Sequence, residues 1–238
     1  PGVQCTDNVV KNALKYFDDT PCFYARGLVP RHWTNAPAQD YELHYEQRFK
    51  QHQEIQRLFT DGSGGPDTKD PRKRRIAWAA VEISDDMEVA AVEAGNLPEG
   101  KQTVPVAELT AMCRAIDMAM APIVILYTDC KMISDGWDKH SHNTNQGLWQ
   151  QIDRARKRAE QRGCKLSCRK VKSHNTEAML AGHMNEMEWY GNMMADAFAA
   201  EYAGRIKLDV GPRADIAVAD STARLVLARL VAIELHCI

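Results

Sequence analysis

The sequence predicts an α/β fold in which helices flank a five-stranded mixed sheet, with three antiparallel strands followed by two parallel strands. Two observations predict this fold class. Three short apolar segments separated by turn-forming residues occupy residues 54–94, and helical and strand-like segments alternate between residues 105 and 202. Strands joined by tight turns pair antiparallel, whereas strands separated by a helix pair parallel. The two patterns together therefore indicate one mixed sheet with helices packed on it.

The first three strands are expected to form an antiparallel meander. Residues 54–60 (EIQRLFT) alternate and then become apolar, and the glycine-rich segment 61–65 (DGSGG) that follows is typical of a turn. Residues 76–83 (IAWAAVEI) and 87–94 (MEVAAVEA) have the composition of two further strands, and the polar residues 84–86 separate them.

A long helix and a buried strand are expected next. The helix begins at Pro105, because proline is favoured in the first turn of a helix. Its large apolar residues fall on one stripe, which consists of Leu109, Met112, Ile116 and Met120. Residues 123–127 (IVILY) form a short, continuously apolar run, which is typical of a parallel strand buried on both faces.

The later segments continue the alternation of helices and strands. The pattern predicts a short helix at 131–137, a longer helix at 148–161, a strand at 165–171 and a helix at 186–202. A strand that follows a helix in this way adds to the parallel part of the sheet.

The chain is expected to have three parts. Residues 1–53 form a partly irregular N-terminal connector, with a short helix at 7–17 and a proline-containing irregular stretch at 18–39. Residues 54–204 form the α/β domain. Residues 205–238 form a C-terminal helical tail, which we expect to dock on the domain or on a partner.

Composition and charge exclude several classes of protein. The net charge of −2 excludes a globally basic nucleic-acid binder but leaves room for a local basic face. Charged residues interrupt every apolar stretch well short of the ~20 residues that a membrane span needs. The chain begins at Pro1 rather than at a methionine, so we expect it to be part of a longer polypeptide.

The cysteines do not predict a disulfide framework. Seven cysteines, an odd number, are scattered over 238 residues, which favours a reducing intracellular compartment, for example the nucleus. A zinc site through Cys164, Cys168, His174 and His183 is an alternative, but the spacing is not that of a standard ligand knuckle.

Four carboxylates stand at positions where they can converge. Asp61 closes the first strand, Glu108 lies in the first turn of the first long helix, Asp129 directly follows the buried strand, and Asp196 lies in the helix at 186–202. Each has a simpler explanation when taken singly: a turn former, a dipole partner, a helix cap and an exposed helix charge. Together, however, four carboxylates repel one another unless a cation lies among them.

Hard divalent cations with oxygen ligands, Mg²⁺ or Mn²⁺, meet that need. Two such ions ~4 Å apart can bind the attacking and leaving oxygens of an in-line phosphoryl displacement. The carboxylates therefore predict a metal-dependent hydrolase.

Five motifs occur in one order along the chain: TDGSGG at 60–65, AELTAM at 107–112, YTDCK at 127–131, VKSH at 171–174 and GNMMADAFA at 191–199. In this order and context they resemble type-1 ribonuclease H, over roughly residues 54–204. The segment QTVPVAEL at 102–109 is most similar to the ribonuclease H domains of non-LTR retrotransposon polyproteins. Residues 54–204 would then be a ribonuclease H-like catalytic domain, with the fold of that family.

The resemblance implies a catalytic site. Asp61, Glu108, Asp129 and Asp196 would bind two Mg²⁺ ions, or two Mn²⁺ ions in their place. His174 would be the mobile histidine that assists proton transfer or product release, and His183 in AGHMNE is its competitor.

The resemblance also implies how substrate is bound. The asparagines that often precede the helical glutamate of this family are replaced by TVPV at 103–106, and Gln102 is expected to compensate for them. The expected substrate-binding residues are Gly62, Ser63, Gln102, Asn192, Lys170 and Lys172. The last two belong to a basic strip, which either tracks phosphates or is simply a solvated face. The strip consists of Arg154, Arg156, Lys157, Arg158, Arg162, Lys165, Arg169, Lys170 and Lys172.

Three functions are compatible with the sequence. The first is an endoribonuclease that cleaves the RNA strand of an RNA–DNA hybrid, leaves 5′-phosphate ends and works beside a reverse transcriptase domain of the same polyprotein, with no membrane partner. The second is a catalytically silent hybrid-binding or interaction module of the same fold. The third is a nuclease of the same broad fold that acts on DNA. The carboxylate set and the TDGSG and AEL motifs favour the first.

Overall fold

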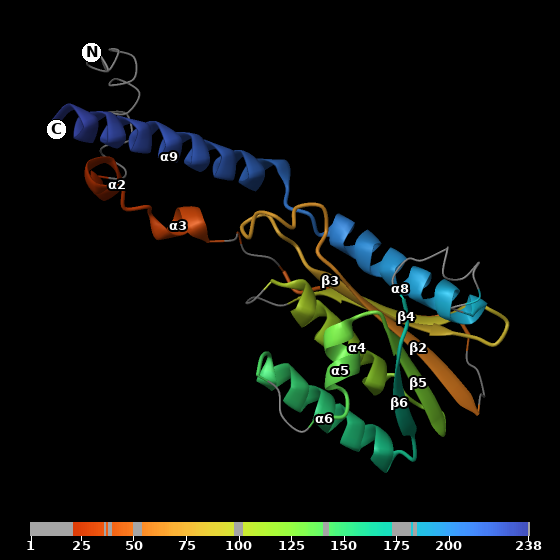
Figure 1. Cartoon of the computed structure of the whole chain (residues 1–238). Helices are drawn as coiled ribbons and strands as arrows, with labels where there is room; N and C mark the ends of the chain where they lie inside the picture. The colour runs from red at the N-terminus through yellow and green to blue at the C-terminus, as the bar shows by residue number, and fades with distance from the viewer. Residues whose placement is uncertain are drawn as a thin grey trace. The chain divides into compact units, whose positions relative to one another are not determined.

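The computed structural model describes residues 21–35, 37, 40–49, 54–97, 102–139, 143–172, 182 and 185–237 (Figure 1). The chain forms two compact units. The larger contains the described parts of residues 38–70 and 74–207, and the smaller contains those of 1–37, 71–73 and 208–238. The helix expected at 7–17 lies outside the described residues. The three-part division expected from the sequence stays a prediction.

The larger unit is built on a six-stranded mixed sheet with the order β1-β4-β3-β2-β5-β6. Its strands are β1 Leu43–Gln47, β2 Ile55–Ser63, β3 Ala77–Ile83, β4 Val89–Asn96, β5 Ile123–Thr128 and β6 Lys165–Lys170. Strands β2, β3 and β4 pair antiparallel, while β5 pairs parallel with both β2 and β6. The predicted fold class and the five predicted strands are confirmed.

The sixth strand, β1, was not predicted from the sequence. It pairs antiparallel with β4 at the edge of the sheet, and all five of its residues are exposed. Beyond the backbone ladder it is held by the buried side chain of Asn96, which accepts from the N–H of Glu42 at 2.8 Å and donates to the carbonyl of Asp40 at 2.6 Å. Because these bonds span more than 50 residues of sequence, no local pattern reveals them.

The start of the turn after β2 was predicted too early, at residue 61. Strand β2 continues through Asp61, Gly62 and Ser63, which pair with β3 as far as Ala77. Glycine and aspartate favour turns in isolation, but the ladder with β3 overrides that preference here. As a result Asp61 lies inside a paired strand rather than in a turn.

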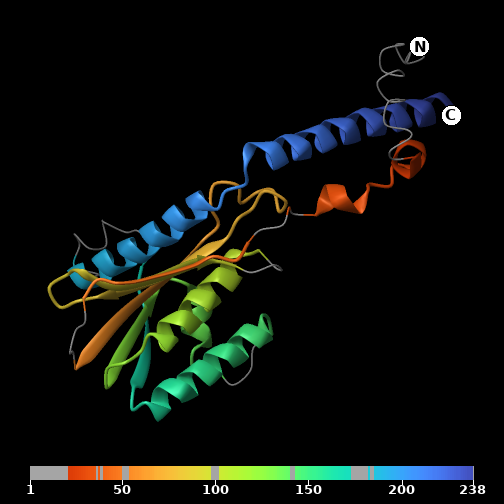
Figure 2. The same ribbon diagram turned by 180° about the vertical axis from the view of Figure 1, so that it is seen from behind.

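Helices cover both faces of the sheet (Figures 1 and 2). The helices are α4 Val104–Asp117, α5 Lys131–Gly136, α6 Gln146–Gln161 and α8 Glu186–Arg205. Successive residues of β2 contact opposite layers, because Leu58 packs with α4 and α6 whereas Phe59 packs with α8. All four helices were predicted to within a few residues at each end. Glu108, however, lies just beyond the first turn of α4, because the helix begins at Val104.

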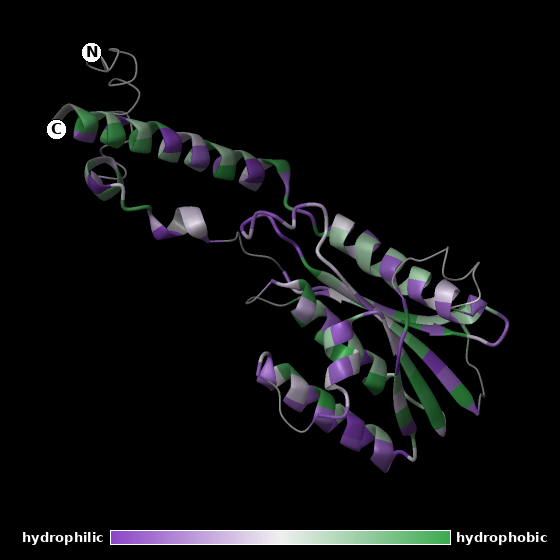
Figure 3. Cartoon of the chain, viewed as in Figure 1, coloured by the Kyte–Doolittle hydropathy of each residue, from purple (hydrophilic) through white to green (hydrophobic). Residues whose placement is uncertain are grey.

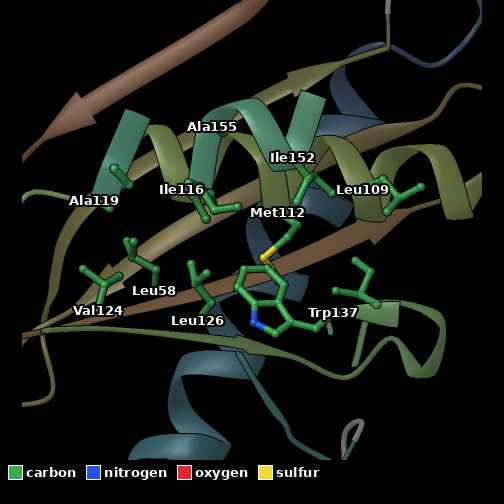
Figure 4. Close-up of a cluster of buried hydrophobic side chains, with 14 of the residues drawn as sticks. Leu58, Leu109, Met112, Ile116, Ala119, Val124, Leu126, Trp137, Ile152 and Ala155 are labelled. Atoms are coloured by element: carbon green, nitrogen blue, oxygen red, sulfur yellow. The ribbon is translucent and has the colours of Figure 1, made fainter. Parts of the chain in front are cut away.

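The core between the sheet and α4 contains most of the expected apolar stripe (Figure 4). Leu109, Met112 and Ile116 are fully buried. The expectation for Met120 is wrong: α4 ends at Asp117, and the side chain of Met120 is 77% exposed.

Helix α8 approaches the other face of the sheet closely at Gly191. A Cβ atom added there would lie 2.4 Å from the ring of Phe59, which stacks on Tyr127 with a centroid distance of 4.5 Å. The helix begins with a capping box in which Asn185 accepts from the N–H of Glu188. These contacts fix α8, and with it Asn192 and Asp196, against β2 and β5.

The smaller unit contains three helices among its described residues: α2 Pro21–Arg26, α3 Arg31–Thr34 and α9 Val210–Cys237. Phe23, Tyr24 and Val226 form its buried cluster, and the guanidinium of Arg229 lies 3.9 Å from the ring centroid of Tyr24. The prediction of an irregular stretch at 18–39 is wrong for α2 and α3. These helices are too short for a periodic pattern, and they become stable only by packing.

Helix α9 begins at Val210, within the tail at 205–238 that the sequence predicted to be helical. Figure 3 shows that hydrophilic residues interrupt its hydrophobic ones along its length. Among the described residues, no helix is long and apolar enough to cross a membrane.

Candidate metal-binding active site

The parallel pairing of β2 and β5 brings two carboxylates to the same level of the sheet. Thr60 of β2 pairs with Thr128 of β5, so the next residue of each segment, Asp61 and Asp129, lies beside the other. Two threonine hydroxyls fix the local backbone. Thr60 Oγ1 donates to the carbonyl of Tyr127 at 3.2 Å, and Thr128 Oγ1 accepts from the N–H of Cys130 at 3.1 Å.

Helix α4 adds the third carboxylate. The backbone N–H of Gly62 hydrogen-bonds the carboxylate of Glu108. A Cβ atom on Gly62 would lie only 2.8 Å from the backbone nitrogen of Glu108, so glycine permits this close approach of helix and strand. Carboxylate oxygens of Asp61, Glu108 and Asp129 consequently lie within 4.8 Å of one another.

Helix α8 adds the fourth carboxylate from the opposite face. Asp196 is half-buried and is hydrogen-bonded to Asp61. The simpler explanation of Asp196 as an exposed helix charge is therefore wrong. Asn192 is buried one turn earlier on the same helix.

Burial and mutual repulsion set the electrostatics of these four carboxylates, which we call the carboxylate cluster. The pKa of Asp61 is raised from 3.8 to about 7, mainly by burial and then by the negative charges of Asp129 and Asp196. Burial also raises the pKa of Glu108 well above its ordinary value, followed by the charges of Asp61 and Asp129. The cluster stores repulsion that a cation would relieve.

The residues fit a hard divalent cation. All donors are carboxylate oxygens, the type that Mg²⁺ and Mn²⁺ prefer. Moreover, Glu108 Oε2 is buried and has no hydrogen-bond partner among the described residues. Such an atom is costly in a folded protein unless something else binds it. The cluster could therefore bind a metal ion.

The other sequence-predicted residues lie at different distances from this cluster. Gly62 and Ser63 continue β2 beyond Asp61, and Lys170 ends β6 opposite Thr128. Lys172 is exposed just beyond β6. Gln102 bridges backbone groups, since its Oε1 accepts from Ile76 and its Nε2 donates to Leu97. His174 and His183 lie outside the described residues.

Three arginines of the basic strip are engaged in contacts within the protein. Arg156 donates to the carbonyl of Trp137 and lies over its indole ring, and Arg162 donates to the carbonyls of Ile116 and Ala119. Arg158 pairs with Asp117. The other exposed basic side chains on α6, on β6 and just beyond it are Arg154, Lys157, Lys165, Arg169, Lys170 and Lys172.

The zinc alternative gains no support from the described residues. Cys164 is buried and its Sγ lies 3.7 Å from the carbonyl oxygen of Ala119, while Cys168 packs against the same core. Among the described residues, only the group of Asp61, Glu108 and Asp129 has the geometry to hold a metal ion. The cysteines whose side chains are described are free.

One positioning residue was missed from the sequence. Thr128 is fully buried, and its hydroxyl holds the backbone at Asp129 in a tight local turn. The signal was available, because threonine followed by Asp-Cys after an apolar strand can form such a side-chain-to-backbone turn.

Comparison with known proteins identifies the class of protein. The family model described as RNase H matches residues 53–203, and the chain belongs to this family. No curated protein matches the chain.

Solved structures with a similar fold include RNase H1 of the halophilic archaeon Halobacterium salinarum, with 20% identity, 63% of this chain and 98% of that chain covered, and a TM-score of 0.46. The RNase H domain of the foamy virus PFV has 18% identity, coverage of 63% and 94%, and a TM-score of 0.48. LC11-RNase H1, isolated from compost and solved in complex with an RNA/DNA hybrid, has 15% identity, coverage of 63% and 97%, and a TM-score of 0.43.

Proposed function

We propose that this chain is a divalent-metal-dependent endonuclease that hydrolyses the RNA strand of RNA–DNA hybrids. Membership of the RNase H family supports the proposal. The observation that carries it is the convergence of Asp61, Glu108 and Asp129 within 4.8 Å, with one buried oxygen of Glu108 lacking a hydrogen-bond partner. A solely structural cluster would have no reason to place mutually repelling groups there.

The carboxylate cluster would hold two divalent cations, Mg²⁺ or in its place Mn²⁺. Bound ions of this kind make water a stronger nucleophile and neutralise charge on a leaving oxygen. Asp61 and Asp129 would face them from neighbouring strands, Glu108 from α4 and Asp196 from α8. The bond from Gly62 orients one oxygen of Glu108 and leaves Oε2 for the ion.

The surrounding residues would bind and orient the hybrid. The exposed side chains of Lys170 and Lys172 would contact phosphates, and Gly62 and Ser63, which follow Asp61 in β2, would contact the substrate beside it. We propose that Asn192 supports the site and contacts substrate. Gln102 would act mainly by holding the backbone before α4, although a substrate contact remains part of the proposal. Recognition would depend on duplex shape, phosphates and 2′-hydroxyls.

Proton transfer or product release would depend on His174, with His183 as its competitor. The products would carry 5′-phosphate and 3′-hydroxyl ends. The similarity of QTVPVAEL to retrotransposon ribonuclease H domains supports a place in a retroelement, beside a reverse transcriptase domain of the same polypeptide.

A substrate comparison tests the proposal. End-labelled RNA–DNA hybrid, DNA duplex and RNA duplex of one sequence would be incubated with the chain in Mg²⁺ and, separately, in EDTA. We expect internal cuts in the RNA strand of the hybrid only, and only with Mg²⁺. Cleavage of the DNA duplex would favour a DNA nuclease of the same fold. Tight hybrid binding without cutting in Mg²⁺ or Mn²⁺ would favour a silent binding module.

A further inference from the structure

A groove of about 1040 Å³ lies on the α4 side of the sheet. Leu43 and Tyr45 of β1 line one side, and the end of α4 with Met118 and Met120 lines the other. Gln56 and Pro122 place the groove where β2 and β5 begin. The carboxylate cluster lies where these strands end, so the groove is separate from the proposed active site.

One wall of the groove is an open sheet edge. Strand β1 is the last strand in the sheet order, so its outer backbone groups have no strand partner among the described residues. Leu43 is 45% and Tyr45 is 55% exposed, and both face the groove. Natural proteins usually cover or charge such an edge, because its unpaired backbone invites another strand. An edge strand that exposes two apolar side chains beside a groove is thus a place where an extended segment can add.

The groove is acidic. Among the described residues, its lining includes the carboxylates of Glu54, Glu82, Glu93 and Asp117 but only one cationic side chain, that of Arg114. Arg114 pairs with Glu93, whereas Glu82 accepts a hydrogen bond from the uncharged Gln56 at 3.0 Å. The unbalanced charge therefore comes mainly from Glu54 and Glu82, with Asp117 held by Arg158 outside the groove.

The negative charge of the groove determines which kind of molecule can bind there. A nucleic acid would be repelled by the carboxylates. Antiparallel pairing of two copies through β1 would set two acidic grooves side by side on one face, which is also unfavourable. A lysine or arginine side chain fits both features, since its aliphatic stem can lie on Leu43 and Tyr45 while its charged head reaches the carboxylates.

We propose that the groove binds an extended segment of a partner protein with lysine or arginine at every second position. The segment adds as a strand along the outer edge of β1. Alternate residues of a strand face the same side, so all of its basic side chains enter the groove. The intervening residues of the segment face the other side of the sheet, beside His44 and Glu46. At these positions the segment needs only residues that favour a β-strand.

A synthetic peptide tests this recognition. The probe is a blocked octapeptide of alternating arginine and threonine. A second octapeptide has the same composition with its four arginines in one block, and a third has glutamate in place of arginine. We expect the alternating peptide to bind the full chain at least tenfold more tightly than the block peptide, and the glutamate peptide not to bind. We also expect it to slow amide exchange along β1.

Two charge reversals provide a matched pair of variants. Glu54→Lys changes the charge inside the groove, and Glu46→Lys changes it equally on the opposite face of β1. Both residues are exposed, so both variants should fold and keep hybrid cleavage. Glu54→Lys should weaken binding of the alternating peptide about tenfold, and Glu46→Lys should change it less than threefold.

Several results would overturn the proposal. They are equal binding of the alternating and block peptides, no binding at millimolar peptide, equal effects of the two charge reversals, or unchanged amide exchange in β1. Concentration-dependent dimerisation that protects β1 and is abolished by Leu43→Lys would also overturn it, since a second copy would then be the occupant.

Discussion

At the scale of the residue, Glu108 shows that the carboxylate cluster lowers the stability of the metal-free protein. The residue is only 5% exposed, its carboxylate accepts from Gly62, and Oε2 has no hydrogen-bond partner among the described residues. Asp61 and Asp129 lie within 4.8 Å. An arrangement that leaves a buried carboxylate among like charges is unfavourable for folding by itself. It becomes favourable when a cation binds.

Removing one of these charges should stabilise the metal-free protein. In Glu108→Gln the amide oxygen can still accept from Gly62, while the amide nitrogen can donate to a neighbouring carboxylate. In EDTA we expect a higher unfolding temperature than wild type, by about 2–4 °C for each kcal/mol of relieved repulsion at this chain length. Added Mg²⁺ should raise the unfolding temperature of wild type and barely change that of the variant.

Glu160→Gln is a suitable control for thermal unfolding, because Glu160 is exposed on α6 and far in sequence from the cluster. It should behave as wild type in EDTA and in Mg²⁺. A lower unfolding temperature of Glu108→Gln in EDTA would contradict this account of the stored repulsion.

The pH dependence of stability should reflect the raised pKa of Asp61. Because its pKa is 3.8 when unfolded and about 7 when folded, the folded state binds more protons between these values. The contribution of Asp61 to stability without divalent cations should therefore fall as pH rises from about 4 to about 7 and level off above that range, while the raised pKa of Glu108 adds a loss in the same direction. Urea unfolding in EDTA at pH 5 and pH 8 measures this. Asp61→Asn should reduce the loss, and an unchanged slope in that variant would refute the assignment.

At the scale of the element, glycines decide how closely the helices approach the sheet. Gly62 allows α4 to reach β2, and Gly191 allows α8 to pack on the ring of Phe59. Both positions are inside regular elements, where glycine costs stability unless close packing requires it. Gly62 is adjacent to Asp61, and Gly191 lies five residues before Asp196 on α8, so packing and site geometry are coupled.

Gly191→Ala should displace α8 and reduce cleavage. The new Cβ would lie 2.4 Å from the Phe59 ring, and overpacking of this kind typically costs about 1–3 kcal/mol. The matched control is Gly204→Ala on the same helix, where a Cβ meets nothing within 4 Å. We expect the control to be neutral or slightly stabilising in urea unfolding. Gly191→Ala should lose stability and also weaken the Mg²⁺-induced stabilisation, because Asp196 moves with α8.

If Gly191→Ala lost stability but kept full Mg²⁺-induced stabilisation and cleavage, α8 would not position the site. Equal loss of stability in Gly191→Ala and Gly204→Ala would show that contact of the new Cβ with Phe59 does not explain the effect.

Elements with strong periodicity were predictable, and elements stabilised by distant partners were not. The segment IVILY and the stripe of Leu109, Met112 and Ile116 each depend on a local pattern, and the structure confirms them as β5 and α4. Strand β1 depends on Asn96 and on pairing with β4, far away in sequence. The extension of β2 through Gly62 depends on β3 in the same way. The prediction that Met120 belongs to the buried stripe was wrong because periodicity does not reveal where a helix ends.

At the scale of the whole molecule, the order of the motifs predicted which carboxylates converge. The parallel register of β2 and β5 explains why Asp61 and Asp129 lie close together. The helices on the two faces of the sheet explain why Glu108 and Asp196 lie beside them. The sequence could not predict the electrostatic detail. The unpartnered oxygen of Glu108 and the bond between Asp61 and Asp196 follow from packing of α4 and α8 on opposite faces.

Asp129→Asn tests the central claim most directly, because it removes one charge from the cluster and keeps nearly the same size. The measurement is single-turnover cleavage of a labelled RNA–DNA hybrid in Mg²⁺, with hybrid affinity measured in parallel in Ca²⁺. We expect wild type to cut the RNA strand internally and the variant to cut at least a hundredfold more slowly, while it still folds and binds the hybrid. Undiminished Mg²⁺-dependent cleavage by a folded Asp129→Asn would contradict the claim that this carboxylate cluster is the catalytic site.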